Sequence, residues 1–208
     1  MVEVSDKLVN TVLPLMEDFY TIQGEGFYQG QAAYFIRLGG CDVGCVWCDV
    51  KESWDASAHP LVSVEEITKR AKATGTPAAV ITGGEPLMYD LTLLTRSLQL
   101  SGIRTHLETS GVYPLTGTWN WICFSPKKFK AADPTIPPAA DELKIIVYNQ
   151  SDFDWAEDHA ERVSKSCELF LQPEWSREKE MIPLIIEYIK THPQWKISLQ
   201  IHKYMNIP

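Results

Sequence analysis

Short apolar runs recur along the chain, and glycine, proline or polar residues bound each of them. Residues 32–38 are rich in aromatic and branched side chains, which predicts the first clear strand. Similar runs predict six further strands, at residues 78–82, 103–108, 119–124, 143–148, 167–171 and 196–201. Three prolines mark a loop between the fourth and fifth strands, because proline cannot donate to a strand ladder; they are Pro134, Pro137 and Pro138.

Amphipathic stretches between these runs predict helices. Ser63 and Glu66 have capping-box spacing and begin a helix that Gly75 and Pro77 end. Further helices are predicted at residues 87–101, 153–165 and 176–191.

Strands that alternate with helices predict an α/β fold with a mostly parallel sheet. Few full-length helices separate the middle strands. We therefore expect an incomplete (partial) TIM-type barrel with shortened helices, in a single domain over residues 1–208. The site should lie at the C-terminal ends of the strands.

Composition narrows the class of protein. The 208 residues are 45% apolar and 22% charged, as in ordinary globular proteins, and the net charge of −8 argues against a nucleic-acid-binding surface. Charged residues such as Glu3 and Asp6 interrupt any signal-peptide hydrophobic region. The most apolar helical stretch, residues 181–189, is too short to cross a membrane. We expect a cytoplasmic protein whose thiols stay reduced.

Cys41, Cys45 and Cys48 have the spacing C-x3-C-x2-C. Three thiolates this close can hold three irons of a 4Fe-4S cluster and leave one iron open to an outside ligand. The alternative is a structural zinc site, whose fourth ligand would have to come from Asp49 or a distant histidine such as His59. A disulfide framework is disfavoured, because the cysteine count of five is odd and nothing indicates export.

A second motif, Thr82-Gly83-Gly84-Glu85-Pro86, follows the next predicted strand. Together with the cysteine loop it resembles the radical S-adenosylmethionine (SAM) superfamily. The resemblance implies that SAM chelates the open iron, and that electron transfer from the cluster generates a 5′-deoxyadenosyl radical. The glycine-rich turn then meets the methionine amino group, since glycines let a backbone approach a ligand closely.

Further segments narrow the resemblance to the 7-carboxy-7-deazaguanine synthase family. They span residues 22–26 (IQGEG), 35–38 (FIRL), 108–111 (ETSG), 125–127 (SPK), 171–173 (LQP) and the final stretch 199–208. The resemblance runs from about Phe19 to the end of the chain. It implies a carbon-nitrogen lyase that contracts 6-carboxy-5,6,7,8-tetrahydropterin to 7-carboxy-7-deazaguanine with loss of ammonia, in queuosine biosynthesis. It also implies a homodimer, an external electron donor such as flavodoxin or ferredoxin, and recycling of SAM.

The family resemblance also implies roles for individual residues. Cys41, Cys45 and Cys48 hold the cluster. The SAM contacts it implies are Trp47, Gly84, Ser125, Pro126, Lys127, Gln172, Pro173, Glu174 and Trp175. The substrate contacts it implies are Ile22, Gln23, Gly24, Arg37, Thr82 and the carboxylate of Pro208, with Arg37 on the substrate carboxylate.

Simpler interpretations stand beside these roles. Arg37 could instead form a salt bridge on a polar sheet face, and Gln23 and Glu25 could be turn residues. His106 is interpreted as a hydrogen-bonded strand histidine, whereas His202 is a candidate for the pocket lining.

The chain departs from the family at Val50, where many members have a threonine whose hydroxyl contributes to a magnesium site. Valine offers no side-chain oxygen, and magnesium demands oxygen ligands. We therefore expect weaker magnesium dependence here. Two competing functions remain: a radical SAM activase that abstracts hydrogen from a glycine of a partner protein, and a non-enzymatic zinc-binding module.

Overall fold

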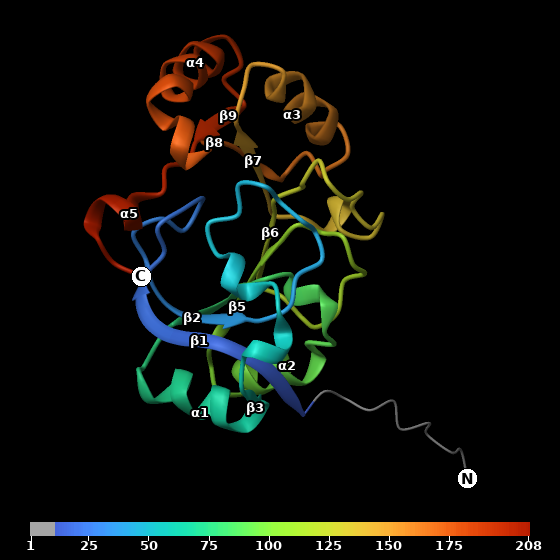
Figure 1. Cartoon of the computed structure of the whole chain (residues 1–208), viewed down its shortest axis with the longest axis vertical. Coiled ribbons are helices and arrows are strands. Elements are labelled where there is room, and N and C mark those ends of the chain that lie inside the picture. Colours follow the sequence, from blue (N-terminus) through green and yellow to red (C-terminus); the bar gives the residue numbers. More distant parts are fainter. Residues whose placement is uncertain (1–10) are drawn as a thin grey trace.

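The computed structural model describes residues 11–208, so Glu3 and Asp6 lie outside the described residues. A single nine-stranded sheet forms its centre, in the order β3-β1-β2-β4-β5-β6-β7-β8-β9 (Figure 1). The strands are β1 (Val12–Ile22), β2 (Ala32–Leu38), β3 (Leu61–Ser63), β4 (Ala78–Gly83), β5 (Arg104–Thr109), β6 (Trp121–Phe124), β7 (Glu142–Val147), β8 (Glu168–Pro173) and β9 (Trp195–Ile197).

The successive pairs in β2-β4-β5-β6-β7-β8-β9 are all parallel, whereas β1 pairs antiparallel with both β2 and β3. The sheet curves without closing, because no pairing joins β3 or β1 to β9 in the described chain. This is the partial barrel that the sequence predicts.

Strands β1 and β3 are absent from the sequence prediction. In β1, Pro14 and the adjacent charged residues Glu17 and Asp18 interrupt the apolar pattern, and the register shifts between Leu15 and Glu17. The strand forms because tertiary pairing outweighs local propensity. Its presence also corrects the prediction that residues 32–38 are the first strand.

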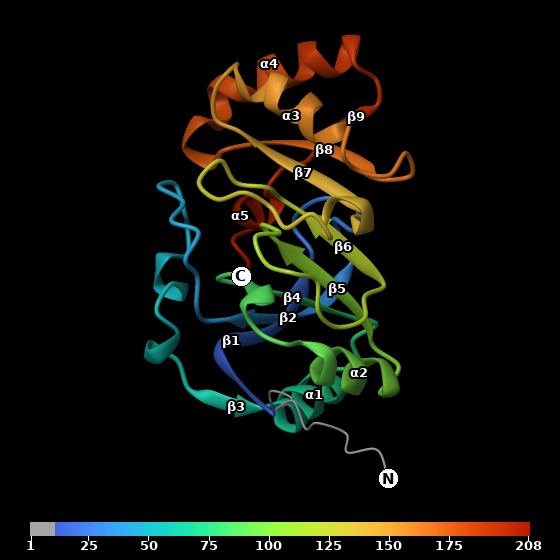
Figure 2. The same cartoon turned by 90° about the vertical axis from the view of Figure 1, so that its right-hand side faces the viewer.

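Four principal helices pack on the outer face of the sheet: α1 (Val64–Ala73), α2 (Thr92–Leu100), α3 (Asp152–Ala160) and α4 (Glu178–Thr191). Figure 2 shows α1 and α2 at one end of the sheet and α3 and α4 at the other. The Ser63 hydroxyl accepts a hydrogen bond from Glu66 N at 3.2 Å and caps α1, as predicted.

Helices α2 and α3 are shorter than predicted. Residues 86–88 form a separate 3-10 turn before α2, and α3 ends at Ala160 rather than at residue 165. The last predicted strand, 196–201, is wrong at its end. Strand β9 stops at Ile197, and Ile201 begins α5 (Ile201–Met205).

Buried aliphatic side chains fill the space between the helices and the sheet, and they include Ile36, Ile81, Leu94, Leu107 and Leu143. The side chains of the opposite strand faces point into the barrel, since successive residues alternate between faces. Within residues 11–208, no helix combines the length and apolarity needed to cross a bilayer.

The open edge of the barrel is bridged by loops rather than by strand pairing. Gly26 N donates to the Ser198 hydroxyl at 2.9 Å, and Ile201 N donates to the Gly24 carbonyl at 3.0 Å. Gln200 Nε2 also reaches the Glu25 carboxylate at 2.9 Å. We name these contacts between residues 24–26 and 198–201 the seam; they bring the start and the end of the chain's fold together beside the barrel interior.

Candidate functional site

A cavity of about 310 Å³ occupies the barrel interior at the C-terminal ends of the parallel strands. Eighteen residues are predicted to contact the cluster, the cofactor or the substrate, and all of them except Pro126 line this cavity. Val50 also lines it. The structure therefore brings the cysteine loop, the strand-end motifs and the residues near both ends of the chain into one cavity.

The three cysteines of the loop after β2 are free thiols that are neither fully buried nor fully exposed. Cys41 N donates to the Trp54 carbonyl at 3.1 Å, and Cys48 N donates to the Cys45 carbonyl at 3.2 Å, which fixes the loop. Burial raises the pKa of the Cys41 and Cys45 thiols.

The thiol arrangement fits a cubic cluster better than a single ion. In such a 4Fe-4S cluster each of the three thiolates binds a different iron, so the sulfurs lie around the cluster rather than at one point. Among the described residues, no three His, Cys, Asp or Glu side chains converge as a single metal ion requires. Cys41, Cys45 and Cys48 are therefore suited to hold an iron-sulfur cluster.

The glycine-rich turn after β4 packs against the cysteine loop. A Cβ added at Gly84 would lie 2.1 Å from the Gly40 carbonyl oxygen and 3.0 Å from Cys41 Cβ, so only glycine fits. Gly84 N and Glu85 N donate to the carbonyls of Leu38 and Gly40, each at 2.8 Å. The motif thus joins the end of β4 to the residue that precedes the first cysteine.

Glu85 is buried beneath this turn and organises the next strand end. Its carboxylate accepts hydrogen bonds from Leu87 N at 3.1 Å, from the Thr109 hydroxyl at 2.6 Å and from Ser110 N at 2.8 Å. Glu85 thus holds the turn and the end of β5 together, and it does not line the cavity.

On the β6–β8 side of the cavity, Lys127 Nζ donates to the carbonyl and hydroxyl oxygens of Ser125, both at 2.6 Å. Burial lowers the pKa of Lys127. Gln172 Oε1 accepts a hydrogen bond from Ser198 at 2.7 Å, and Glu174 accepts one from Ser176 N at 3.1 Å. These strand ends present backbone and side-chain polar groups to the cavity.

Two tryptophans of the cavity lining, Trp47 and Trp175, pack against further aromatic rings. The Trp47 ring lies parallel to that of Tyr148, with centroids 5.8 Å apart, and 4.9 Å from that of Phe129. Trp175 lies 5.6 Å from Tyr204, and Lys203 Nζ lies 4.8 Å from the Trp175 ring. Flat apolar faces beside the cysteine loop suit a planar or sulfonium-bearing ligand.

Arg37 lines the cavity, yet it also makes the salt bridge that was the simpler interpretation. Arg37 Nη1 lies 3.0 Å from Glu17 Oε1, and its guanidinium lies 5.6 Å from the Phe19 ring. Arg37 is level with Thr82 in the parallel pairing of β2 and β4, so both side chains point into the barrel. Because Glu17 belongs to the strand that was not predicted, the sequence could not identify this partner.

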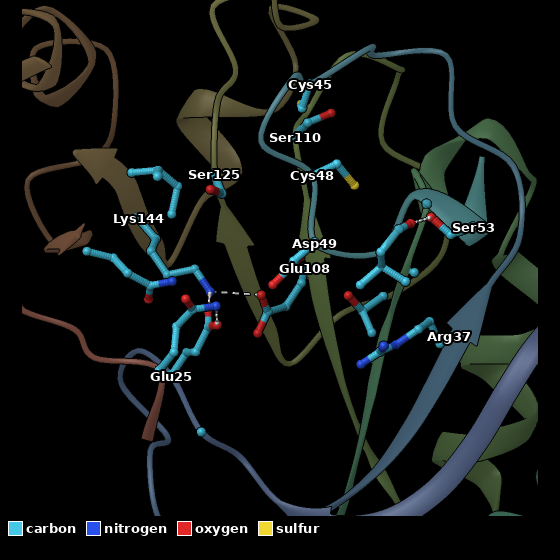
Figure 3. Close-up of a pocket in the computed structure, with 18 of the residues that line it drawn as sticks. Glu25, Arg37, Cys45, Cys48, Asp49, Ser53, Glu108, Ser110, Ser125 and Lys144 are labelled. Carbon is cyan, nitrogen blue, oxygen red and sulfur yellow. Dashed lines mark hydrogen bonds and ion pairs between the residues drawn. The ribbon is translucent and has the colours of Figure 1, made fainter. Parts of the chain in front are cut away.

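Lys144 is the main cavity residue that the sequence interpretation missed. Its ammonium lies 2.5 Å from Glu25 Oε2 and 2.9 Å from Glu108 Oε2, and its side chain is only 3% exposed (Figure 3). Gln23 Nε2 donates to Glu108 Oε1 at 3.0 Å, and Glu25 N donates to Gln23 Oε1 at 3.0 Å. Gln23 and Glu25 are therefore members of a polar network rather than simple turn residues.

Charge complementarity sets the protonation of this network. Burial alone would raise the pKa of Glu25, but the charge and hydrogen bond of Lys144 lower it to about 2. Burial alone would lower the pKa of Lys144, but Cys123, Glu108 and Glu25 raise it well above its ordinary value. At neutral pH the cavity floor therefore holds the Lys144 ammonium beside an ionised Glu25. A lysine inside the apolar run 143–148, two residues from Glu142, was the available sequence signal.

His202 and His106 differ in their position relative to the main cavity. His202 lines the main cavity and packs against Gly24, where an added Cβ would lie 2.3 Å from its Nδ1. His106 does not line the main cavity, and its buried Nε2 has no hydrogen-bond partner. The prediction of a hydrogen-bonded strand histidine is therefore wrong for this nitrogen; the ring packs against that of Tyr28, with centroids 4.5 Å apart.

Comparison with known proteins agrees with this geometry. Residues 35–121 match the Radical SAM superfamily. The chain is 55% identical to the 7-carboxy-7-deazaguanine synthase of Flavobacterium psychrophilum over 95% of this chain and 93% of that protein. It is 49% identical to the synthase of the same name from Synechocystis sp., over 97% of this chain and 96% of that one. The crystal structure of QueE from Escherichia coli superposes with a TM-score of 0.82 at 31% identity, covering 90% of this chain and 93% of that chain.

A partial barrel with a three-cysteine loop at its C-terminal edge defines a member of the radical SAM superfamily. Within that superfamily, the chain belongs to the 7-carboxy-7-deazaguanine synthase family. The family match therefore argues against the two alternative functions, a glycyl-radical activase and a zinc-binding module.

Proposed function

We propose that this protein is a 7-carboxy-7-deazaguanine synthase. It would convert 6-carboxy-5,6,7,8-tetrahydropterin to 7-carboxy-7-deazaguanine with release of ammonia, as a carbon-nitrogen lyase of queuosine biosynthesis. The observation that carries the proposal is a single cavity that holds the three cysteines at one side and Arg37, Thr82 and Pro208 among the other lining groups. A small anionic substrate would thereby be held next to the cluster.

Cys41, Cys45 and Cys48 would hold the 4Fe-4S cluster. The groups proposed for SAM are the turn at Gly84, the strand ends at residues 125–127 and 172–175, and the Trp47 ring. When bound, the cluster and SAM supply a radical that removes hydrogen from the substrate. Pro126 stands apart from the cavity lining, so we propose that it shapes the turn between Ser125 and Lys127 rather than touching the cofactor.

The substrate would be held by its polar edges. Arg37 would take the carboxylate in a bidentate pair, with Glu17 keeping the guanidinium oriented. Ile22, Gln23, Gly24, Thr82 and Pro208 would meet the pterin. Glu108 and Lys144 lie on the same cavity floor, where a carboxylate can accept and an ammonium can donate hydrogen bonds.

The reaction also needs an electron from outside. We propose an external donor such as flavodoxin or ferredoxin, a homodimeric assembly and a cytoplasmic location, where thiols stay reduced. The partial exposure of the cysteine loop supports access by a donor, since Val46, at its centre, is 67% exposed.

The decisive experiment is anaerobic incubation of the reconstituted protein with SAM, dithionite and the carboxytetrahydropterin. We expect 7-carboxy-7-deazaguanine and ammonia in equal amounts by mass spectrometry and ammonia assay. A control lacking SAM should give neither. Fully reconstituted protein that leaves the pterin unchanged would overturn the proposal.

Magnesium is a separate part of the proposal. The Val50 side chain has no oxygen, and its carbonyl already accepts hydrogen bonds from Ser53 Oγ at 2.7 Å and Ser53 N at 3.1 Å. The neighbouring Asp49 carboxylate is bound by Lys203 at 2.8 Å. Residue 50 therefore does not fit the threonine role in a magnesium site.

We accordingly expect turnover to persist in a chelator, within about threefold of that with magnesium, because no side chain at position 50 binds the ion. Val50→Thr should make turnover magnesium-stimulated, whereas the matched loop substitution Val46→Thr should not. Turnover with and without EDTA checks this. Complete dependence on magnesium that is the same in all three proteins would contradict it.

A further inference from the structure

A second, smaller cavity lies beside the main one, behind the Gln23–Glu25–Glu108 network. It has room for about 10 Å³, enough for a single water-sized molecule. It shares Gln23, Glu25 and Glu108 with the main cavity, so an occupant would lie within one side chain of the substrate. His106 and Glu142 also line it, together with Tyr28, Trp121 and Cys123.

The lining of this cavity is strongly acidic. Glu25, Glu108 and Glu142 contribute three carboxylates. Two cations lie nearby: Lys144 pairs with Glu25 and Glu108, and the Arg104 guanidinium lies 5.6 Å from the Tyr28 ring centroid. Glu142 Oε2 accepts hydrogen bonds from Phe27 N at 3.2 Å and Trp121 Nε1 at 3.0 Å, but for Oε1 the structure shows only the weak thiol contact of Cys123, at 3.6 Å. Burial, and then the charge of Glu108, raise the pKa of Glu142, against the opposing effect of Lys144.

His106 supplies an independent sign of a ligand. The residue is 5% exposed, its ring lines the cavity, and its Nε2 has no hydrogen-bond partner. Burial, and then Arg104, lower the pKa of His106 to about 4, so the ring is neutral at pH 7. A neutral imidazole offers one acceptor nitrogen, and a buried acceptor without a donor is costly.

The aromatic neighbours favour a cation over a neutral molecule. The Tyr28 ring centroid lies 4.5 Å from that of His106 and 5.0 Å from that of Trp121. Aromatic faces attract cations, and an ammonium ion has the size of a water molecule but donates four hydrogen bonds. Water would satisfy His106 without offsetting the carboxylates, and larger spherical ions want more oxygen ligands than this lining offers.

We propose that this cavity binds one ammonium ion, held by the carboxylates of Glu25, Glu108 and Glu142 and by His106 Nε2. The inference rests on the proposed function, because the ring contraction releases its nitrogen as ammonia, which is protonated at neutral pH. The site would receive that product beside the substrate pocket, and ammonium would also bind when no turnover takes place.

The test is nuclear magnetic resonance of the reconstituted, oxidised protein in ¹⁵N-ammonium chloride at pH 7. We expect a bound ammonium signal in slow exchange, with cross-peaks to the ring protons of Tyr28 or Trp121. His106→Phe, which fills the cavity and removes the acceptor, should weaken binding at least about tenfold. His106→Gln, which keeps an acceptor oxygen, should retain the signal, as should the matched control His159→Phe on α3.

Several outcomes would overturn the inference. They are the absence of a bound signal in the wild-type protein, a signal unchanged in His106→Phe, or displacement by equal concentrations of potassium or methylammonium. Thermal unfolding checks that each variant is folded, and if His106→Phe does not fold, His106→Leu replaces it. Product formation without bound ammonium would overturn this inference alone, whereas bound ammonium without product would overturn the proposed function alone.

Discussion

Lys144→Met is expected to abolish turnover and to destabilise the protein by about 3–5 kcal/mol, because it leaves two carboxylates without their buried cation. The Lys144 ammonium lies 2.5 Å from Glu25 and 2.9 Å from Glu108, and 3% of its side chain is exposed. Methionine matches the length of the lysine stem but supplies no charge. The repulsion between the carboxylates would also displace the residues 23–25 that line the substrate side of the cavity.

Urea unfolding and turnover measure the two effects. Lys196→Met is the matched control, because Lys196 pairs with Glu168 at 2.5 Å on the surface, with 51% of its side chain exposed, and should cost at most about 1 kcal/mol. Adding Glu25→Gln to Lys144→Met should recover part of the lost stability by removing one uncompensated charge. A loss below about 1 kcal/mol for Lys144→Met would show that other groups stabilise the carboxylates.

Cys48→Ser is expected to reduce turnover to background without unfolding the chain. The thiolate is the iron ligand, and a serine hydroxyl stays protonated at neutral pH, so the cluster would lose one of its three attachments. Cys48 lies in an irregular loop at intermediate exposure, and its substitution should change the free energy of unfolding by less than about 0.5 kcal/mol.

Iron and sulfide content per chain, measured after anaerobic reconstitution, checks this expectation beside turnover and urea unfolding. Cys167→Ala is the control, because Cys167 is a buried free thiol in the apolar core and should keep both cluster and turnover. Full iron content and turnover in Cys48→Ser would mean that the loop is not the cluster site.

The parallel part of the fold could be predicted from local pattern. Strand β2 is mostly buried and is bounded by glycine-containing turns, and the Ser63 cap begins α1 where the sequence places it. Strand β1 escaped prediction because Pro14, Glu17 and Asp18 break its apolar pattern, and only pairing with two neighbours makes it a strand. The helix at Ile201 replaces the end of a predicted strand because Ile201 N is bound by Gly24, nearly the full chain length away.

The cavity residues that belong to recognisable sequence motifs could be predicted. The cysteines, Arg37 and Thr82 follow from strand-end position and family resemblance, and the structure brings them together. Lys144 could not be recognised, because its partners lie on β5 and in the loop after β1, and nothing in a single sequence gives that proximity. The same holds for Glu17 beside Arg37 and for the unpartnered nitrogen of His106.

The seam is the part of the barrel wall where small molecules can most easily enter and leave the cavity. Local opening concentrates where few bonds cross, and the seam joins the two sides of the barrel by a few loop and side-chain hydrogen bonds, whereas every other boundary is a strand ladder. Local opening of the barrel is therefore expected at the seam, while β2 and β4 stay paired beside the cysteine loop. Entry and exit of small molecules would then leave intact the β2–β4 pairing from which the cysteine loop extends.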